Sequence, residues 1–275
     1  MIKSFDHFDL QIIAESGQCF RWKKVSSDPM TYEIIHKGHF LRIQKIPCTD
    51  DTATRGASFD LSCSEETFDS VWKDYFDLQT DYYAIEKSIY AFNDKHLIEC
   101  FEKGAGIRIL KQDLWEMIVS FMISQNNNIK RISNSIEKIC NKAALPAIEN
   151  QTAYRFPLPG EINESLFEDT SLGLGYRVPY LIEIYKYGRE NPGWLNELEA
   201  MSFDDAYKNL LSHLGIGPKV SNCICLFGLH HTEAFPIDTH IKQLLNKYYN
   251  GHFDTDKFPD SAGIIQQYLF YYEIS

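Results

Sequence analysis

The sequence predicts an α+β protein in which an N-terminal antiparallel β domain packs on a predominantly helical domain. Aromatic and β-branched runs flank Lys37-Gly38, a pattern typical of a β-hairpin. From Leu114 onward, apolar residues recur at helical spacing instead. We place the boundary after the glycine-rich stretch Gly104-Ala105-Gly106, so that the two domains cover residues 1–107 and 108–275.

The β domain is expected to contain several strands and then a helix. We predict strands at residues 20–22, 32–36 and 39–43, because these runs are rich in aromatic and β-branched side chains. Residues 48–64 are small and polar, which predicts a loop. From Glu66 the apolar side chains follow one helix face: Phe68, Val71, Trp72 and Tyr75.

The helical domain shows apolar stripes separated by turns. The first helix should end at Asn126-Asn127-Asn128, since asparagine favours turns and caps. A second helix is expected at residues 129–140, a glycine-loosened turn at 172–177, and a further helix at 178–188. The stripes consist of Leu114, Met117, Ile118, Phe121 and Met122; Ile132, Ile136 and Ile139; Tyr207, Leu210, Leu211 and Leu214; Val220, Cys223, Ile224 and Phe227; and Ile241, Leu244 and Leu245.

Composition and charge limit the classes of function. Of the 275 residues, 44% are hydrophobic, enough to build a full core without disulfides. The seven cysteines are scattered, without a CxxC pair, which predicts a reduced, cytoplasmic protein without a zinc or iron–sulfur site. No apolar run reaches the length of a membrane span. The net charge of −11 argues against nucleic acid, so binding to DNA would require cations and backbone donors clustered on one face.

The stretch around Gly215-Ile216-Gly217 lies between two apolar stripes and predicts a helix-hairpin-helix turn. Gly215 and Gly217 permit a close approach of a phosphate at a helix N-terminus, where free N–H groups favour an anion. Lys219 follows in the first helical turn, where the helix dipole opposes positive charge and favours the neutral amine that nucleophilic attack requires. The alternatives that stay open are an ordinary turn between two helices and a surface lysine that contacts phosphate.

Asp238 stands immediately before an apolar-periodic helix and is predicted to be its N-cap. The same carboxylate has a candidate catalytic role, because capping would fix its direction. It would then stabilise positive charge on a deoxyribose ring and assist proton transfers near the lysine.

The Gly215–Lys219 turn followed by Pro236-Ile237-Asp238 resembles the helix-hairpin-helix/Gly-Pro-Asp superfamily of DNA glycosylases. Within that superfamily, four further segments in the same order resemble the 8-oxoguanine DNA glycosylase family. These segments are residues 16–22 (SGQCFRW), 124–129 (SQNNNI), 172–177 (LGLGYR) and 262–270 (AGIIQQYLF).

The resemblance implies a role for each matching position. Lys219 matches the nucleophile that forms a Schiff base, and Asp238 the catalytic aspartate. Gly17 matches the glycine whose carbonyl accepts the N7 proton that oxidised guanine has and guanine lacks. The other implied roles are reading of the Watson–Crick edge by Gln266, a base sandwich between Cys223 and Phe270, filling of the vacated stack by Asn126, a wedge at Tyr176, reading of the opposite cytosine by Arg131 and Arg177, and a phosphate or pocket contact by His240.

Each of these positions also has a purely structural interpretation. Cys223 and Phe270 suit a core, Asn126 a helix end, and the arginines solvated charges, so the assignment depends on their joint occurrence. The chain departs from the family pattern at Cys19, where a small hydroxyl residue is usual. It departs again at Glu273, where an aspartate near His240 is usual.

The function expected from this resemblance is excision of 8-oxoguanine from duplex DNA, followed by strand cleavage by β-elimination. A glycosylase for another damaged base and a non-catalytic DNA-binding module remain alternatives. We expect no redox or organic cofactor and no membrane partner, and we leave open a cation at the hairpin. We expect a monomer, and the compact N-terminal domain resembles bacterial or archaeal members acting at the nucleoid.

Overall fold

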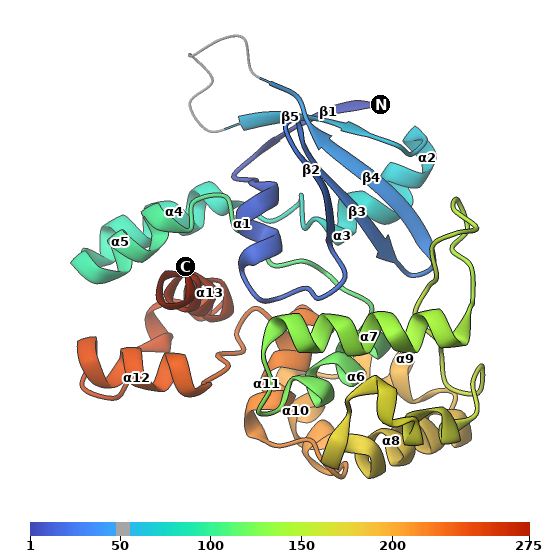
Figure 1. The fold of residues 1–275 in the computed structure, drawn as a ribbon. Helices are drawn as coiled ribbons and strands as arrows, with labels where there is room; N and C mark the ends of the chain where they lie inside the picture. Colours follow the sequence, from blue (N-terminus) through green and yellow to red (C-terminus); the bar gives the residue numbers. More distant parts are fainter. Residues whose placement is uncertain (48–55) are drawn as a thin grey trace. The chain divides into compact units, whose positions relative to one another are not determined.

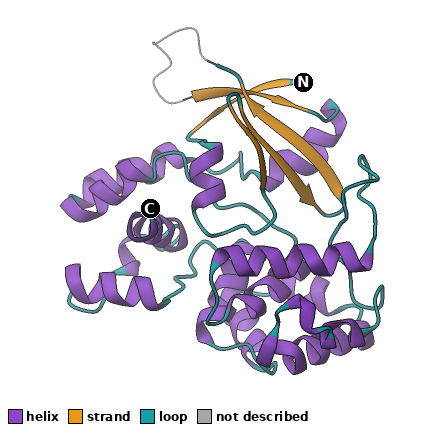
Figure 2. Ribbon diagram, viewed as in Figure 1, coloured by secondary structure: helices purple, strands orange, loops and turns teal. Residues whose placement is uncertain are grey.

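The computed structural model describes residues 1–47 and 56–275 (Figure 1). It confirms the predicted α+β class, with a five-stranded sheet near the N-terminus and a mostly helical remainder (Figure 2). The chain forms two compact units. The first unit comprises Met1–Ile34, Leu41–Lys111 and Thr232–Ser275, and the second comprises Ile35–Phe40 and Gln112–His231.

This division differs from the single boundary expected near residue 107. The second unit begins close to that position, but Thr232–Ser275 groups with the first unit and not with the helical domain. The reason lies in α13 (Ala262–Ile274), which packs against α5 (Lys95–Lys103). The Tyr268 ring meets the Phe101 ring edge to face, with 5.3 Å between centroids. The last helix thus buries its apolar surface on residues from the N-terminal part of the chain.

The sheet has the strand order β1-β5-β4-β3-β2, so the first strand of the sequence pairs with the last. Its hairpin was predicted correctly, because β3 and β4 flank Lys37 and Gly38, whose φ angles of 47° and 83° suit a tight hairpin turn. The strands are β1 (Ile2–Asp6), β2 (Lys23–Ser27), β3 (Met30–His36), β4 (His39–Lys45) and β5 (Gly56–Leu61).

Two predictions in this region were wrong. Phe20 and Trp22 precede β2 and do not form a strand; the Trp22 indole donates a hydrogen bond to the Tyr75 hydroxyl (2.7 Å) and so serves packing. The predicted loop at 48–64 contains β5, in which buried Phe59 and Leu61 alternate with small or polar neighbours. Residues 62–64 follow β5 without strand structure, and residues 48–55 lie outside the described residues.

The core of the first unit lies between the sheet and the predicted helix after Glu66. This helical segment consists of α2 (Glu65–Thr67), a π-helical turn (Phe68–Trp72) and α3 (Lys73–Tyr75), which confirms the prediction. Its buried aromatic side chains join those of the sheet, each contributing about 1.5–3 kcal/mol by burial. The first unit also contains α1 (Leu10–Glu15), α4 (Tyr82–Phe92), α5, α12 (Thr239–Tyr248), a 3₁₀ turn (Thr255–Lys257) and α13.

The second unit is built around α6, whose residues from Leu114 to Ile123 are all buried. Its predicted apolar stripes are helical, with one correction: Leu214 lies beyond its helix and is 57% exposed, because the chain turns after Leu211. The helices are α6 (Leu114–Ser124), α7 (Ile129–Ala143), α8 (Val178–Glu190), α9 (Trp194–Glu199), α10 (Phe203–Leu211) and α11 (Pro218–Phe227), with 3₁₀ turns at Glu164–Glu168, Thr170–Leu172 and Gly175–Arg177.

The substitution Gly106→Ala should destabilise the first unit strongly. Gly106 has a φ of 104°, and an added Cβ would lie 2.8 Å from the Asp9 Cβ and 3.0 Å from the Asp9 backbone nitrogen. We expect the free energy of unfolding to fall by about 3 kcal/mol, measured by urea denaturation. Gly193→Ala is the control, because its nearest neighbour would be 3.6 Å away, and it should change stability by less than about 0.5 kcal/mol. Equal effects of the two substitutions would contradict this explanation.

Candidate DNA-binding and catalytic site

The predicted hairpin is present in the second unit, where α10 ends at Leu211 and α11 begins at Pro218. The two glycines of the hairpin differ in backbone conformation and in their surroundings. Gly215 has a φ of 83°, and an added Cβ would lie 2.5 Å from the Tyr180 ring. Gly217 has a φ of −93°, and a Cβ there would meet no described atom within 4 Å. Gly215 is therefore required by packing, whereas Gly217 leaves an open surface in front of α11.

The N-terminus of α11 is suited to an anion. Gly217 occupies the N-cap and offers no capping side chain, and Pro218 follows with its fixed φ. N–H groups in the first turn of a helix carry a partial positive charge and commonly bind phosphate. The open surface at Gly217 is therefore a candidate contact for a DNA phosphate.

Lys219 lies in this first turn, and its side chain is partly buried. Its amine stands over the Phe121 ring of α6, 5.3 Å from the centroid. Cys223 follows one helical turn later, so it shares a face of α11 with Lys219, and it is buried. The structure thus groups the predicted nucleophile with one predicted wall of the base pocket.

Gln125, at the end of α6, holds the hairpin in place, and the sequence analysis did not single it out. Its side-chain amide donates to the backbone carbonyls of Gly215 (2.9 Å) and Met122 (3.0 Å). In the sequence, Gln125 stood out only as part of the segment 124–129 that resembles the family, next to the asparagine run that ends the helix. Gln125 is therefore a positioning residue for the glycine turn.

The predicted DNA-contacting residues Asn126, Tyr176 and Arg177 cluster around the backbone carbonyl of Gln125. The Arg177 Nε donates to this carbonyl at 3.1 Å, and its NH1 donates to the Leu174 carbonyl at 3.1 Å. Tyr176 is half exposed, and its hydroxyl lies 3.3 Å from both the Gln125 carbonyl and the Asn126 amide nitrogen. Arg177 is only 5% exposed, so in this conformation its guanidinium supports the loop and does not present a free donor array.

Arg131 lies near the start of α7 and, unlike Arg177, is exposed. Asn128 caps this helix: its Oδ1 accepts a hydrogen bond from the Arg131 backbone N–H at 3.0 Å. The backbone that carries the Arg131 side chain is therefore held at the start of the helix. Among the described residues, Arg131 forms no ion pair. It is therefore the more available of the two predicted cytosine readers.

The first unit contains the other predicted site residues. Gly17 has a φ of 79° in the loop between α1 and β2. Gln266 and Phe270 lie one turn apart on α13, and the Phe270 ring is 6.1 Å from the His240 ring. Gln266 is 4% exposed, and its Oε1 has no hydrogen-bond partner among the described residues. This buried oxygen is therefore available to accept a hydrogen bond from a water or a ligand.

Asp238 caps α12 as predicted. Its Oδ1 accepts a hydrogen bond from the backbone N–H of Ile241 at 2.8 Å. The side chain is partly exposed, and the cap fixes its orientation at the helix start. The geometry confirms the cap, while the catalytic role of Asp238 stays a prediction.

The acidic charge of the chain is unevenly distributed. The sequence of the first unit contains 16 Lys and Arg residues against 24 Asp and Glu residues, a net charge of −8. The second unit, which carries the hairpin, contains 11 against 14, a net charge of −3. The unit with the candidate phosphate site is therefore close to neutral.

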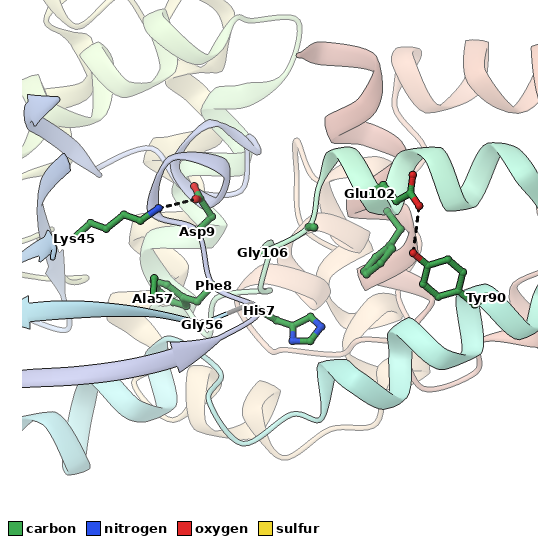
Figure 3. A pocket seen from close by; sticks show the side chains of 11 residues that line it. His7, Phe8, Asp9, Lys45, Gly56, Ala57, Tyr90, Glu102 and Gly106 are labelled. Carbon is green, nitrogen blue, oxygen red and sulfur yellow. Dashed lines mark hydrogen bonds and ion pairs between the residues drawn. The ribbon is translucent and has the colours of Figure 1, made fainter. Parts of the chain in front are cut away.

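A cavity of about 420 Å³ in the first unit involves none of the predicted site residues (Figure 3). An ion pair between Asp9 and Lys45 (3.6 Å) lies on one side, and a hydrogen bond from Tyr90 to Glu102 (3.3 Å) on the other. The described residues contain no cluster of three or more His, Cys, Asp or Glu side chains arranged for a metal. None of the described helices has the length and apolar character needed to cross a membrane.

Comparison with known proteins identifies the family. Residues 1–118 match the family described as the 8-oxoguanine DNA glycosylase N-terminal domain. The solved 8-oxoguanine glycosylase/lyase of Clostridium acetobutylicum, in complex with double-stranded DNA containing cytosine opposite 8-oxoG, is 31% identical. The match covers 99% of this chain and 97% of that chain, with a TM-score of 0.83. The chain belongs to the 8-oxoguanine DNA glycosylase family.

Two further relatives define the limits of the likeness. A probable N-glycosylase/DNA lyase of Methanothermobacter thermautotrophicus is 28% identical over 96% of this chain and 92% of its own length. The 3-methyladenine DNA glycosylase of Archaeoglobus fulgidus is 18% identical with a TM-score of 0.74, covering 99% of this chain and 98% of that chain. The latter shows a shared fold alone. Because the fold alone does not distinguish these proteins, the choice of lesion has to be sought in individual side chains.

The two hairpin glycines of this 8-oxoguanine DNA glycosylase family member should respond differently to substitution. Gly215→Ala should lower the melting temperature, because its Cβ would overlap the Tyr180 ring. Gly217→Ala should leave the melting temperature unchanged but weaken binding to duplex DNA by about tenfold, since its methyl group would stand where a phosphate approaches. Thermal denaturation and fluorescence anisotropy check both effects. Unchanged binding in Gly217→Ala would remove this surface from the DNA interface.

Proposed function

We propose that this protein is a bifunctional DNA glycosylase and AP lyase that removes 8-oxoguanine, opposite cytosine, from duplex DNA. The observation that carries the proposal is the placement of Lys219. Its amine lies in the first turn of α11, over the Phe121 ring, directly behind the glycine turn that suits a phosphate. The same turn that anchors the backbone would thus present a nucleophile to the adjoining sugar.

In the proposed reaction, the damaged nucleotide is flipped out of the duplex. The Lys219 amine attacks C1′ of the deoxyribose, and the base leaves with the electron pair of the N-glycosidic bond. The capped carboxylate of Asp238 stabilises the positive charge on the sugar and assists the proton transfers. Opening of the sugar gives a Schiff base with Lys219; loss of a C2′ proton then expels the 3′ phosphate and nicks the strand 3′ to the lesion.

Recognition of the base is assigned to four residues, as the resemblance implies. The carbonyl of Gly17 would accept the N7 proton that distinguishes 8-oxoguanine from guanine. The unpartnered Oε1 of Gln266 would accept an N–H from the Watson–Crick edge. Cys223 and Phe270 would cover the two faces of the base. An acceptor left unpaired by the wrong base costs binding energy, which is an effective basis for discrimination.

Recognition of the remaining duplex is assigned to the cluster around Gln125 and to Arg131. Asn126 would fill the vacated position in the stack, and Tyr176 would wedge beside it. Arg131 is proposed as the main reader of the orphaned cytosine because its guanidinium is exposed, whereas Arg177 is engaged with backbone carbonyls. His240, beside Phe270, is assigned to a phosphate or pocket contact.

A glycosylase for another damaged base is the main alternative, supported by the fold shared with a 3-methyladenine DNA glycosylase. A monofunctional enzyme activates water and needs no lysine, so Lys219 disfavours it. We further propose that the protein acts as a cytoplasmic monomer on nucleoid DNA, without an organic or redox cofactor. A cation bound by hairpin carbonyls is compatible with this mechanism.

The lysine assignment predicts a covalent adduct. Borohydride should trap the protein on a duplex that carries 8-oxoguanine opposite cytosine, because it reduces the Schiff base to a stable amine. Lys219→Gln should abolish the adduct and lower excision at least about a thousandfold, measured by gel electrophoresis of labelled DNA.

Lys186→Gln serves as the matched control, because it removes a lysine of the same unit on the separate helix α8. It should be trapped as efficiently as the unmodified protein. An adduct that persists in Lys219→Gln would exclude Lys219 as the nucleophile. An adduct on an alkylated or deaminated base, but not on 8-oxoguanine, would favour the alternative glycosylase.

The opposite-base preference should depend on Arg131. Arg131→Ala removes the exposed donors and should reduce the preference for cytosine over the other three opposite bases by about tenfold, since a base contact contributes about 1–3 kcal/mol of discrimination. Excision rates on duplexes with each opposite base provide the measurement. Lys130→Ala removes the neighbouring exposed cation and should weaken binding to all four duplexes equally, without changing the preference among them. If the Arg131→Ala preference is unchanged, another residue reads the cytosine.

A further inference from the structure

Gln267 lies next to Gln266 on α13 and is only 1% exposed. Its side-chain Nε2 donates a hydrogen bond to the backbone carbonyl of Ser16, a residue 251 positions earlier in the chain. Ser16 immediately precedes Gly17. One buried amide thus joins the helix that carries the proposed edge reader to the loop that carries the proposed N7–H acceptor.

The other side of Gly17 is fixed as well. Gln18 is fully buried, and its Nε2 donates to the Ser16 hydroxyl and to the Arg108 carbonyl, each at 2.9 Å. Its Oε1 accepts from the Leu110 backbone N–H at 2.8 Å. Gly17, in its left-handed conformation, is therefore bracketed by two glutamines that bind backbone groups.

Position matters here because a carbonyl oxygen that reads a proton must be held within a few tenths of an ångström. The Gly17 carbonyl belongs to the peptide that follows the one bound by Gln267. Rotation or translation of the Ser16–Gly17 peptide would move that oxygen directly. Gly17 itself has no side chain, so the position of its carbonyl depends on the groups that hold Ser16 and Gln18 on either side.

We infer that Gln267 is a specificity-determining positioning residue: it clamps the Ser16 carbonyl so that the Gly17 carbonyl is held for the N7 proton of the oxidised base. This inference rests on the proposed function, because it concerns the same base-reading loop. Gln267 would touch neither the base nor the sugar. It would act by coupling the two base-reading segments of the first unit.

The test uses Gln267→Met, which keeps the side-chain length and removes the N–H donor. Binding is measured by fluorescence anisotropy in the Lys219→Gln background, so that no base is excised. The duplexes carry 8-oxoguanine, guanine, or a tetrahydrofuran abasic analogue opposite cytosine. We expect Gln267→Met to weaken binding to the 8-oxoguanine duplex by about tenfold and to leave the tetrahydrofuran duplex unchanged, because the latter offers no base to Gly17.

Ile89→Val is the matched control, because it removes a fully buried methyl group from a different element of the same unit, α4. It should lower the melting temperature but preserve the preference for 8-oxoguanine over guanine. Gln267→Leu, which also lacks a hydrogen-bond donor and has a branched side chain of similar bulk, should reproduce the selective loss if Gln267→Met fails to fold.

The outcomes separate the two hypotheses. Equal weakening on the 8-oxoguanine and tetrahydrofuran duplexes, or no weakening on either, would show that Gln267 does not position the base reader. If the parent Lys219→Gln protein itself bound 8-oxoguanine no more tightly than guanine, the proposed function would fail, and the inference with it.

Discussion

The second unit depends on Gln125, whose side chain and backbone join three segments from distant parts of the sequence. Its side-chain amide binds the Gly215 carbonyl of the hairpin, and its own carbonyl receives the Arg177 guanidinium. Because Gln125 also ends α6, the loop that begins at Asn126 is fixed from the same point. Loss of this residue would loosen the Gly215–Gly217 turn and the cluster of Asn126, Tyr176 and Arg177 together. The proposed phosphate contact at Gly217 and the proposed wedge at Tyr176 are therefore held in place by the same residue.

The first unit uses buried amides in a contrasting way. Gln18 and Gln267 bind backbone groups, so they give order to the loop at Gly17. Gln266, on the same helix as Gln267, leaves its Oε1 without a partner. A buried polar atom is normally satisfied, since an unpaired one costs about 1–3 kcal/mol. The Gly17 loop is therefore held by two hydrogen-bonded glutamines, whereas the Gln266 Oε1 on α13 has an acceptor position left over.

The sequence predicted the features that depend on neighbouring residues. Helical stripes such as that of α6, the Lys37-Gly38 hairpin and the Asp238 cap all arise from local spacing and were confirmed. The sequence-based prediction was wrong where contacts with residues far away in the chain determine the structure. The strand β5 has few β-forming residues and exists because it pairs with β1 and β4, and α13 joins the first unit through contacts with α5.

The same distinction applies to the candidate site. Glycines, Lys219 and the resemblance to a known family identified the candidate residues, although their roles await experiment. Gln125 and Gln267 were missed because a glutamine carries no local signal for a backbone carbonyl 90 or 251 residues away. The conformation of Arg177, buried against Gln125, was equally hidden in the sequence.

Net charge illustrates how a whole-chain quantity misleads about a local one. A charge of −11 suggested poor affinity for DNA, yet the unit that carries the hairpin has a net charge of only −3. Each phosphate neutralised by a cation contributes through counterion release, so few cations limit that contribution. Affinity would then depend more on helix N–H groups at Gly217 and on base contacts such as Gln266. The acidity of the chain weakens its non-specific binding to undamaged DNA. The short-ranged base contacts form only with a flipped base, so they make up a larger share of the binding free energy and raise selectivity.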